Sequence, residues 1–293
     1  MIQLGPVPVL DIGGTHVTAA HVDLLDGTIS SRHMMALDSY ADASTIVSTI
    51  VNAALRVEPS AGARWGIAIP GPFDYQRGAG SFAGGAKFHG IAGRDLKSEF
   101  ASAFRTGSDN VRFVNDADAY ALGEWHSHGR PERLLCVTLG TGVGAGFIRH
   151  GLPVTHDDAV PVGGNLYQLT WQDRPLEDTV SRRALIAAYG EADLDVRDIA
   201  RLALDGDMRA RAVFEYAMTA LADVLAPWIK GFAPQAIVVG GSIARSWSLI
   251  GPPLESALEI LLGAAGPRIA RCALDDEAPL LGAAFAAQLD RIP

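Results

Sequence analysis

Short apolar segments that stop at glycine alternate along the chain with segments whose apolar residues have helical spacing. Residues 6–14, PVPVLDIGG, predict a strand that ends at its glycines. Residues 16–27 then alternate before an Asp-Gly pair, so the two segments predict a β-hairpin. Apolar residues recur at 46, 47, 50, 51, 54 and 55, which predicts a helix over residues 43–57.

The rest of the first half continues in the same way. A strand at 64–72 ends in a Pro-Gly-Pro turn, and a second strand at 110–118 runs into a polar turn. Helices are predicted at 94–104 and at 119–129, where a glycine ends the second one.

The second half repeats this order of elements. Residues 133–151 predict a strand, a glycine turn and an alternating strand, and superposing them on the first hairpin places Gly140 on Gly13 and Thr138 on Asp11. The elements expected after it are helices at 177–190 and 208–231, a strand with a Gly-Gly-Ser turn at 235–246, and a closing helix at 279–290. Two similar halves predict a duplicated α/β fold with a cleft between the copies.

We expect two tightly connected domains, because no linker rich in proline or serine and no low-complexity tract interrupts the chain. The expected bounds are 1–117 plus the C-terminal helix at 277–293 for a small N-terminal domain, and 118–276 for a larger C-terminal domain. With 293 residues, the chain is long enough for two cores.

The charge balance argues against two classes of binding partner. The formal net charge is −9, and nucleic acids or anionic membranes are bound by concentrated Lys and Arg, so neither is expected as a partner. The two cysteines lie far apart in apolar segments, which favours buried, reduced thiols. No basic and apolar leader precedes the first strand, and no apolar run approaches the roughly 18 residues of a membrane span. We therefore expect a cytoplasmic protein.

Three glycine turns follow strands, and each includes a threonine or serine: 13–15, 140–142 and 240–242. One such turn is weak evidence, because a tight hairpin needs glycine anyway. Three of them favour anion binding, since anions collect where backbone N–H groups converge. The run GTGVGA at 140–145 matches a dinucleotide fingerprint, but it leads into an alternating strand rather than a helix. No Walker loop occurs in the sequence.

Two carboxylates accompany these turns. Asp11 stands two residues before the first glycine, where a polyphosphate would repel it unless a divalent cation lay between them. Asp116 ends a predicted strand, where it could cap the next helix or act as a general base; the local sequence leaves both open. Asp118 is the better candidate for the cap. The neighbouring Asn115 can donate to and accept from sugar hydroxyls.

Together these segments resemble the sugar kinases of the ROK family (repressor, open reading frame, kinase) within the actin-like ATPase superfamily. The similarity extends from one end of the chain to the other. The segments that carry it are LDIGGTHVTAAHVD, GIAIPGPFD, VNDADAYALGE, CVTLGTGVGAGFIRHG, LEDTVSRRAL and APQAIVVGGSIARS. The resemblance implies duplicated ribonuclease-H-like domains with an active-site cleft between them.

The resemblance also implies roles for single residues. Asp116 would be the general base acting on a hexose hydroxyl, usually O6, and Asn115 and Glu177 would bind other hydroxyls beside the turn that contains Gly71. Asp11 would hold Mg²⁺, directly or through water. The residues implied in ATP binding are Gly13, Gly14, Thr15, Gly140, Thr141 and Gly142 at the phosphates, and Gly240 and Gly241 at the adenosine.

The chain departs from the family at two places. Where family kinases have G-E-x-G-H, residues 161–165 read PVGGN, so Val162 replaces the glutamate and Asn165 the histidine. Val162 cannot accept a hydrogen bond from a sugar hydroxyl, whereas Asn165 can. The cysteine cluster of many members is replaced by LYQLTWQDRP, so we expect no structural zinc. The remaining two-ligand pairs, His126 with His128 and His156 with Asp157, are typical of solvated loops.

We therefore expect a kinase that uses ATP and Mg²⁺ to phosphorylate the 6-hydroxyl of a hexose or amino-hexose of the glucose, glucosamine or kanosamine type. The altered 161–165 segment indicates that plain glucose is not the best substrate. A sugar-responsive repressor would need an N-terminal helix-turn-helix, for which the first phosphate loop at residue 11 leaves no room. A non-catalytic sugar-binding protein is the remaining alternative. Dimers are common in the family.

Overall fold

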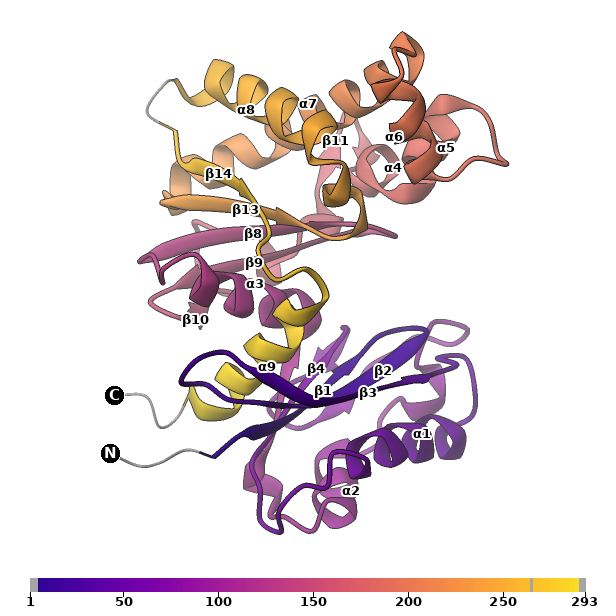
Figure 1. Cartoon of the computed structure of the whole chain (residues 1–293), viewed down its shortest axis with the longest axis vertical. Helices are drawn as coiled ribbons and strands as arrows, with labels where there is room; N and C mark the ends of the chain where they lie inside the picture. The colour runs from indigo at the N-terminus through magenta and orange to yellow at the C-terminus, as the bar shows by residue number, and fades with distance from the viewer. Residues whose placement is uncertain (1–4, 264–265, 290–293) are drawn as a thin grey trace. The chain divides into compact units, whose positions relative to one another are not determined.

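The computed structural model describes residues 5–263 and 266–289 of the chain, which form two compact units (Figure 1). The first unit comprises the residues up to Gly123 together with those from Asp276 onward, and the second is Glu124–Asp275. Each unit is built on its own five-stranded sheet.

The expected domain bounds, 1–117 with 277–293 and 118–276, lie near these divisions. The expected division into a small N-terminal and a larger C-terminal domain stays a prediction. Parts of the expected segments lie outside the described residues: 1–4, 264–265 and 290–293.

The sheet of the first unit has the order β3-β2-β1-β4-β7. Strands β1 (Val7–Ile12) and β2 (His16–Val22) form the predicted antiparallel hairpin, and β3 (Ile29–Ala36) pairs antiparallel to β2. Strands β4 (Trp65–Ile69) and β7 (Val111–Asn115) run parallel to β1. Three parallel strands therefore end at one edge of this sheet.

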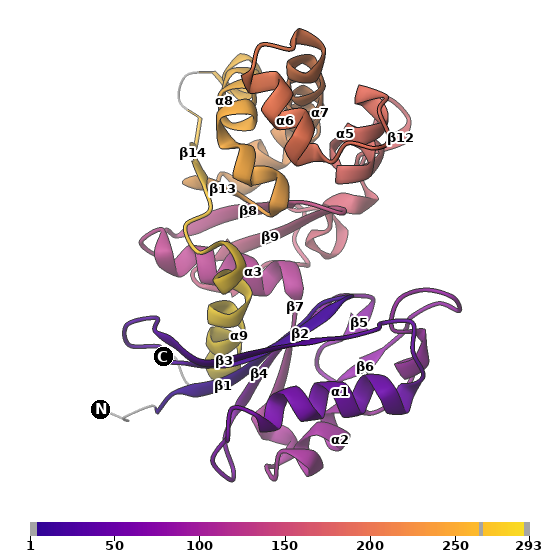
Figure 2. The ribbon, with the colours of Figure 1, turned by 45° about the vertical axis from the view of Figure 1, so that its right-hand side comes forward.

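Helices cover both faces of this sheet. Helices α1 (Ala43–Leu55) and α2 (Leu96–Ala103) lie on one side, and α9 (Ala278–Gln288) lies on the other (Figures 1 and 2). Helix α9 packs so closely on β4 that a side chain at Gly66 would collide with the Ala283 carbonyl. The core beneath α1 and α2 includes the fully buried Leu10, Ile12, Ile46, Ile50 and Phe100.

The sheet of the second unit has the order β10-β9-β8-β13-β14. Strands β8 (Arg133–Leu139), β9 (Val143–Arg149) and β10 (Leu152–Pro153) are antiparallel neighbours. Strands β13 (Ala236–Gly240) and β14 (Arg268–Arg271) run parallel to β8. This is the strand arrangement of the first unit, so the predicted duplication is confirmed.

Within the described part of the second unit lie the helices α4 (Glu177–Val180), α5 (Arg182–Tyr189), α6 (Val196–Leu204), α7 (Met208–Phe232) and α8 (Trp247–Leu262). The single helix expected at 177–190 is therefore two helices, because Ser181 interrupts it and caps α5 by accepting the Ala184 N–H.

Helix α7 is long and apolar enough to cross a membrane, although no membrane span was expected. However, 56% of its most apolar stretch is buried inside the protein, and thirteen of its residues are buried, which is typical of a core helix.

The remaining helix and strands are short or connect the units. Helix α3 (Asp116–Ser127) begins in the first unit and ends in the second. Like β10, four further strands have two residues each: β5 (Phe73–Asp74), β6 (Ala79–Gly80), β11 (Thr170–Trp171) and β12 (Arg174–Pro175). Cys136 and Cys272 are both buried, and neither forms a disulfide bond; that their thiols are reduced stays a prediction.

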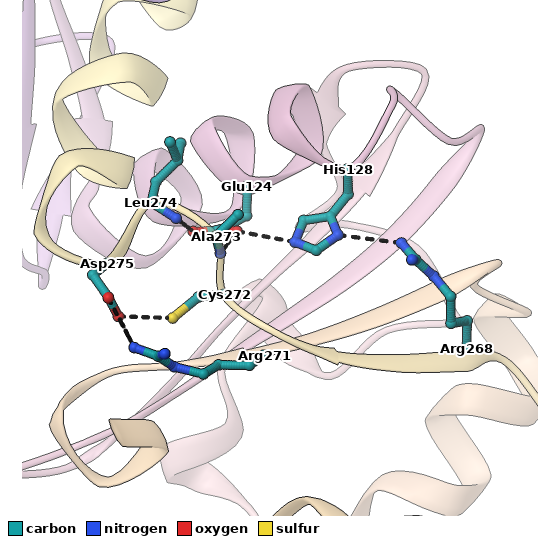
Figure 3. A network of polar contacts seen from close by, with 8 residues as sticks. All are labelled: Glu124, His128, Arg268, Arg271, Cys272, Ala273, Leu274 and Asp275. Atoms are coloured by element: carbon teal, nitrogen blue, oxygen red, sulfur yellow. Dashed lines mark hydrogen bonds and ion pairs between the residues drawn. The ribbon is translucent and has the colours of Figure 1, made fainter. Parts of the chain in front are cut away.

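A buried carboxylate in α3 holds the segment that leads out of the second unit (Figure 3). Glu124 is 0% exposed, and its carboxylate accepts the N–H groups of Ala273 at 2.8 Å and Leu274 at 2.9 Å. His128 lies 3.2 Å from the same carboxylate, and its other ring nitrogen lies 3.2 Å from the Arg268 guanidinium. Glu124 therefore fixes the chain just before it returns to the first unit.

Replacing Glu124 with alanine should lower the free energy of unfolding by about 3 kcal/mol, because charge-assisted hydrogen bonds contribute ~1.5–3 kcal/mol each. Urea denaturation followed by circular dichroism would measure the loss. The control is Glu132→Ala, whose side chain is 46% exposed and lies 3.9 Å from Arg133. It should change the stability by less than ~0.5 kcal/mol. Equal losses in both variants would contradict the assigned role of Glu124.

Candidate active site

Four of the predicted site residues come from the edge of the first sheet where its parallel strands end. Asp11 lies near the end of β1, Gly71 follows β4, Asn115 ends β7 and Asp116 begins α3. Since β1, β4 and β7 are adjacent, the fold brings these residues to one side of the first unit. Ligands of parallel α/β sheets bind at this kind of edge.

Asn115 is the residue that caps helix α3. Its Oδ1 accepts the N–H groups of Ala117 at 3.0 Å and Asp118 at 3.3 Å, and its Nδ2 donates to the Tyr75 hydroxyl at 2.9 Å. The expectation that Asp118 caps this helix was wrong, because the helix begins directly after the strand, at Asp116. One N–H of the Asn115 amide remains for a ligand.

Asp116 presents an exposed carboxylate at this edge. Its Oδ1 accepts the Ala117 N–H at 2.9 Å. Although the residue is exposed overall, the surrounding protein removes part of the solvent from its carboxylate, which raises the pKa of Asp116; the hydrogen bond from Ala117 acts in the opposite direction. A carboxylate that is accessible and more basic than usual can accept a proton from a substrate hydroxyl.

Asp11 and Asp118 are partly buried carboxylates of the same unit. Burial, followed by the charge of Asp116, raises the pKa of Asp11 to about 7; Asp276 adds to this effect and Arg32 opposes it. Burial and then Asp116 likewise raise the pKa of Asp118 to about 7. The negative potential of this group favours a cation.

The residues present fit Mg²⁺ when a nucleotide supplies further ligands. Mg²⁺ takes oxygen ligands and is commonly held by one or two carboxylates together with phosphates and water, which suits Asp11. Over residues 5–263 and 266–289, no group of three or more His, Cys, Asp and Glu side chains is arranged to hold a metal. The pair His126 and His128 is engaged elsewhere, since His126 accepts from Arg130 and His128 lies beside Glu124.

The raised pKa of Asp118 predicts a pH-dependent effect on stability. Its folded-state pKa of about 7 lies above the unfolded value of about 3.9, so the native protein loses stability as the pH rises from about 4 to 7. Asp118→Asn should therefore be neutral near pH 4 and stabilise by ~2 kcal/mol at pH 8, a figure reduced for partial solvent exposure.

Denaturation midpoints at several pH values would measure this difference. Asp109→Asn removes the same charge from an exposed side chain and serves as the control. If Asp118→Asn is no more stabilising at pH 8 than at pH 4, the electrostatic account of this carboxyl fails.

The first glycine turn leaves two backbone donors available. The Gly13 N–H donates to the His16 carbonyl at 2.8 Å, and the Thr15 carbonyl accepts the Leu37 N–H at 2.8 Å. Among the described residues, nothing accepts the N–H groups of Gly14 and Thr15. The turn therefore offers the donors of Gly14 and Thr15 to an anion, while Gly13 closes the hairpin.

The other two turns lie side by side in the second unit. Turn 140–142 joins β8 to β9, and turn 240–242 follows β13, the parallel neighbour of β8. A Cβ at Gly140 would lie 3.5 Å from the Ser242 Oγ. Gly241 has a φ of +86°, and a side chain there would collide with the backbone at the end of β8. Glycine is therefore needed where these two turns meet.

The Glu177 side chain lies against the second glycine turn, at residues 140–142. It begins α4, its Oε1 accepts the Val143 N–H at 2.9 Å, and it occupies the space that a side chain at Gly142 would fill. Its Oε2 has no partner among the described groups. The glycines of 140–145 lead into strand β9, so the dinucleotide fingerprint lacks the helix that it requires.

The altered family segment forms a short 3-10 turn at Val162–Gly164. The side chain of Val162 is 81% exposed, so it is not part of the core. Gly163 has a φ of +66°, and the Asn165 amide nitrogen would lie 2.6 Å from a Cβ placed there. The Asn165 side chain therefore lies over the 3-10 turn that precedes it.

Similarity to known proteins shows the family of this chain. The family model described as ROK family matches residues 8–161 and 172–289. The chain belongs to the ROK family. As the fold class predicts, its structural neighbours are members of this family with the same α/β architecture.

Three similar proteins are named after an activity. A glucokinase of Thermotoga maritima is 26% identical over 311 residues, which cover 94% of this chain and 95% of the relative. An N-acetyl-D-glucosamine kinase of Salmonella paratyphi B is 27% identical over 305 residues, which cover 94% of this chain and 97% of the relative. The crystal structure of a ROK hexokinase from Thermus thermophilus has a TM-score of 0.79 and 28% identity, and the match covers 98% of this chain and 99% of that one.

Proposed function

We propose that this ROK protein transfers the γ-phosphoryl group of ATP to the 6-hydroxyl of a hexose or amino-hexose. The chain is an ATP-dependent carbohydrate kinase. The similar proteins are named after sugar kinase activities. The finer statement rests on one observation: the exposed and unusually basic Asp116 carboxylate lies at the same sheet edge as a turn with two unused N–H donors.

Asp116 would act as the general base. It would accept the proton of the sugar hydroxyl as that oxygen forms a bond to the γ-phosphorus, while the bond from phosphorus to the leaving oxygen of ADP breaks. ADP would leave with the electron pair of that bond. The remaining N–H of Asn115, the free oxygen of Glu177, Asn165 and the turn at Gly71 would contact other sugar hydroxyls.

The glycine turns would hold the nucleotide. The N–H groups of Gly14 and Thr15 would donate to phosphate oxygens. Mg²⁺ held by Asp11, when bound, supplies positive charge against those oxygens. The other proposed nucleotide contacts are Gly13, Gly140, Thr141 and Gly142 for the phosphates, and Gly240 and Gly241 for the adenosine.

The direct test is ADP release from Mg-ATP with glucose, mannose, glucosamine, N-acetylglucosamine and kanosamine. Release with at least one sugar, and a product shown by NMR to be phosphorylated at O6, is expected. The changed pair Val162 and Asn165 leads us to expect that glucose is not the best of these substrates. If no sugar raises ADP release above the background, the kinase proposal fails and the non-catalytic sugar-binding alternative is favoured. A cytoplasmic location and a homodimer stay predictions.

A further inference from the structure

A lysine that sequence patterns did not indicate lies on the first glycine turn. If a Cβ is placed on Gly14, its nearest neighbours are Lys87 Nζ at 3.1 Å, Cδ at 3.2 Å and Cε at 3.3 Å. The backbone of Gly14 does not adopt a positive φ, so its conformation does not require glycine. Because Gly14 has no side chain, the end of the Lys87 side chain can lie close to the turn.

The backbone of Lys87 is fixed by the residue that follows it. Phe88 is only 1% exposed, its N–H donates to the Ser39 carbonyl at 2.6 Å, and its ring packs 5.5 Å from that of Phe82. The Lys87 side chain itself is exposed. None of the described residues accepts a hydrogen bond from its ammonium group or forms an ion pair with it. The Lys87 ammonium is therefore an unpaired cation beside the first glycine turn.

The surrounding charges explain why a cation is useful here. Asp11, Asp116 and Asp118 already make this unit's site negative, and a bound polyphosphate would add several further charges. An ammonium beside the turn would offset that repulsion and stabilise charge on the phosphoryl oxygens. Lys97 of the same unit does not compete for this role, since its Nζ donates to the Gln76 carbonyl.

We propose that the Lys87 ammonium binds the γ-phosphoryl group of the nucleotide at the first glycine turn and stabilises its charge during transfer. This inference rests on the proposed kinase function. Lys87 is then a catalytic residue, because it contacts the group that is transferred.

The test compares Lys87→Ala and Lys87→Arg with the wild type, and uses Lys230→Ala, which removes an exposed lysine of α7, as the matched control. Loss of one donor to a developing charge typically costs about 10²–10³ in rate, so we expect kcat to fall ~100-fold in Lys87→Ala. We also expect calorimetry without sugar to show ~10-fold weaker Mg-ATP binding. Lys87→Arg should recover part of both losses, whereas sugar binding and Lys230→Ala should stay within about twofold of the wild type.

A second variant tests the contact itself. Gly14→Ala places a methyl group where the flexible end of Lys87 lies, so it should displace the ammonium and lower kcat. In a Lys87→Ala background the same change should have little further effect, because the displaced group is gone. If Gly14→Ala is equally harmful in both backgrounds, the contact is not responsible and the proposal is overturned.

The failure of this proposal differs from that of the kinase proposal. An active wild type with an equally active Lys87→Ala, within about threefold, would reject only the role of Lys87. A wild type without activity on any sugar would reject the kinase proposal. In that case, Mg-ATP binding that is unchanged in Lys87→Ala would still reject the lysine contact.

Discussion

Asp116→Asn is expected to lower kcat about 10²- to 10⁴-fold, the range that a general base commonly contributes. The amide keeps the size of the side chain and can still accept the Ala117 N–H, but it cannot take a proton from the sugar. Coupled measurement of ADP release at saturating sugar and Mg-ATP gives kcat. Sugar binding measured by calorimetry should change less than threefold.

Asp118→Asn is the matched control for this experiment, because it removes a neighbouring charge from the same turn of α3. Its kcat should stay within about tenfold of the wild type. The wild-type rate should also fall as the pH is lowered through the raised pKa of Asp116, since the base must be ionised. Near wild-type turnover in Asp116→Asn would reject Asp116 as the base.

Asp11→Asn is expected to raise the Mg²⁺ concentration needed for half-maximal activity by at least about tenfold, because a neutral amide is a weaker ligand for a hard cation than a carboxylate. Titration of Mg²⁺ at a fixed, saturating ATP concentration measures this effect. Binding of the sugar without nucleotide should remain within twofold of the wild type.

The duplicated hairpin supplies the comparison for Asp11. Its counterpart in the second unit is Thr138, which carries no charge, so Thr138→Val should leave the Mg²⁺ requirement nearly unchanged. An equal loss of sugar binding and Mg-ATP use in Asp11→Asn would indicate general damage to the first unit and would contradict the metal role.

The elements that could be predicted are those whose ends are marked in the local sequence. Strands β1, β4, β8 and β13 are apolar runs that stop at glycine or proline. The order of such runs along the chain predicted the duplicated fold. Strand β3 could not be predicted in this way, because half of its residues are polar and five of its eight residues are exposed. Helix α8 contains Pro252 and Pro253, and a Gly-Pro-Pro run normally indicates a break.

The site could be predicted as far as strand ends and turns define it. Asp11, Asn115 and Asp116 follow from their places at the ends of β1 and β7. The capping role of Asn115 could not be predicted, because it depends on α3 beginning directly after β7 with no connecting turn. The place of Lys87 could not be predicted either, since 72 residues lie between it and Gly14 in the sequence and only tertiary packing brings the two together.

The position of α9 has a consequence for the order in which this protein can be completed during synthesis. Its residues, Ala278–Gln288, follow the whole second unit in sequence, yet they cover a face of the sheet that contains β1, which precedes that unit. The second unit is continuous in sequence, whereas the first stays uncovered on that face until the second unit has been synthesised. The sheet that carries Asp11 and leads into Asp116 is therefore covered on both faces only after the second unit has been made, although its five strands are synthesised before that unit.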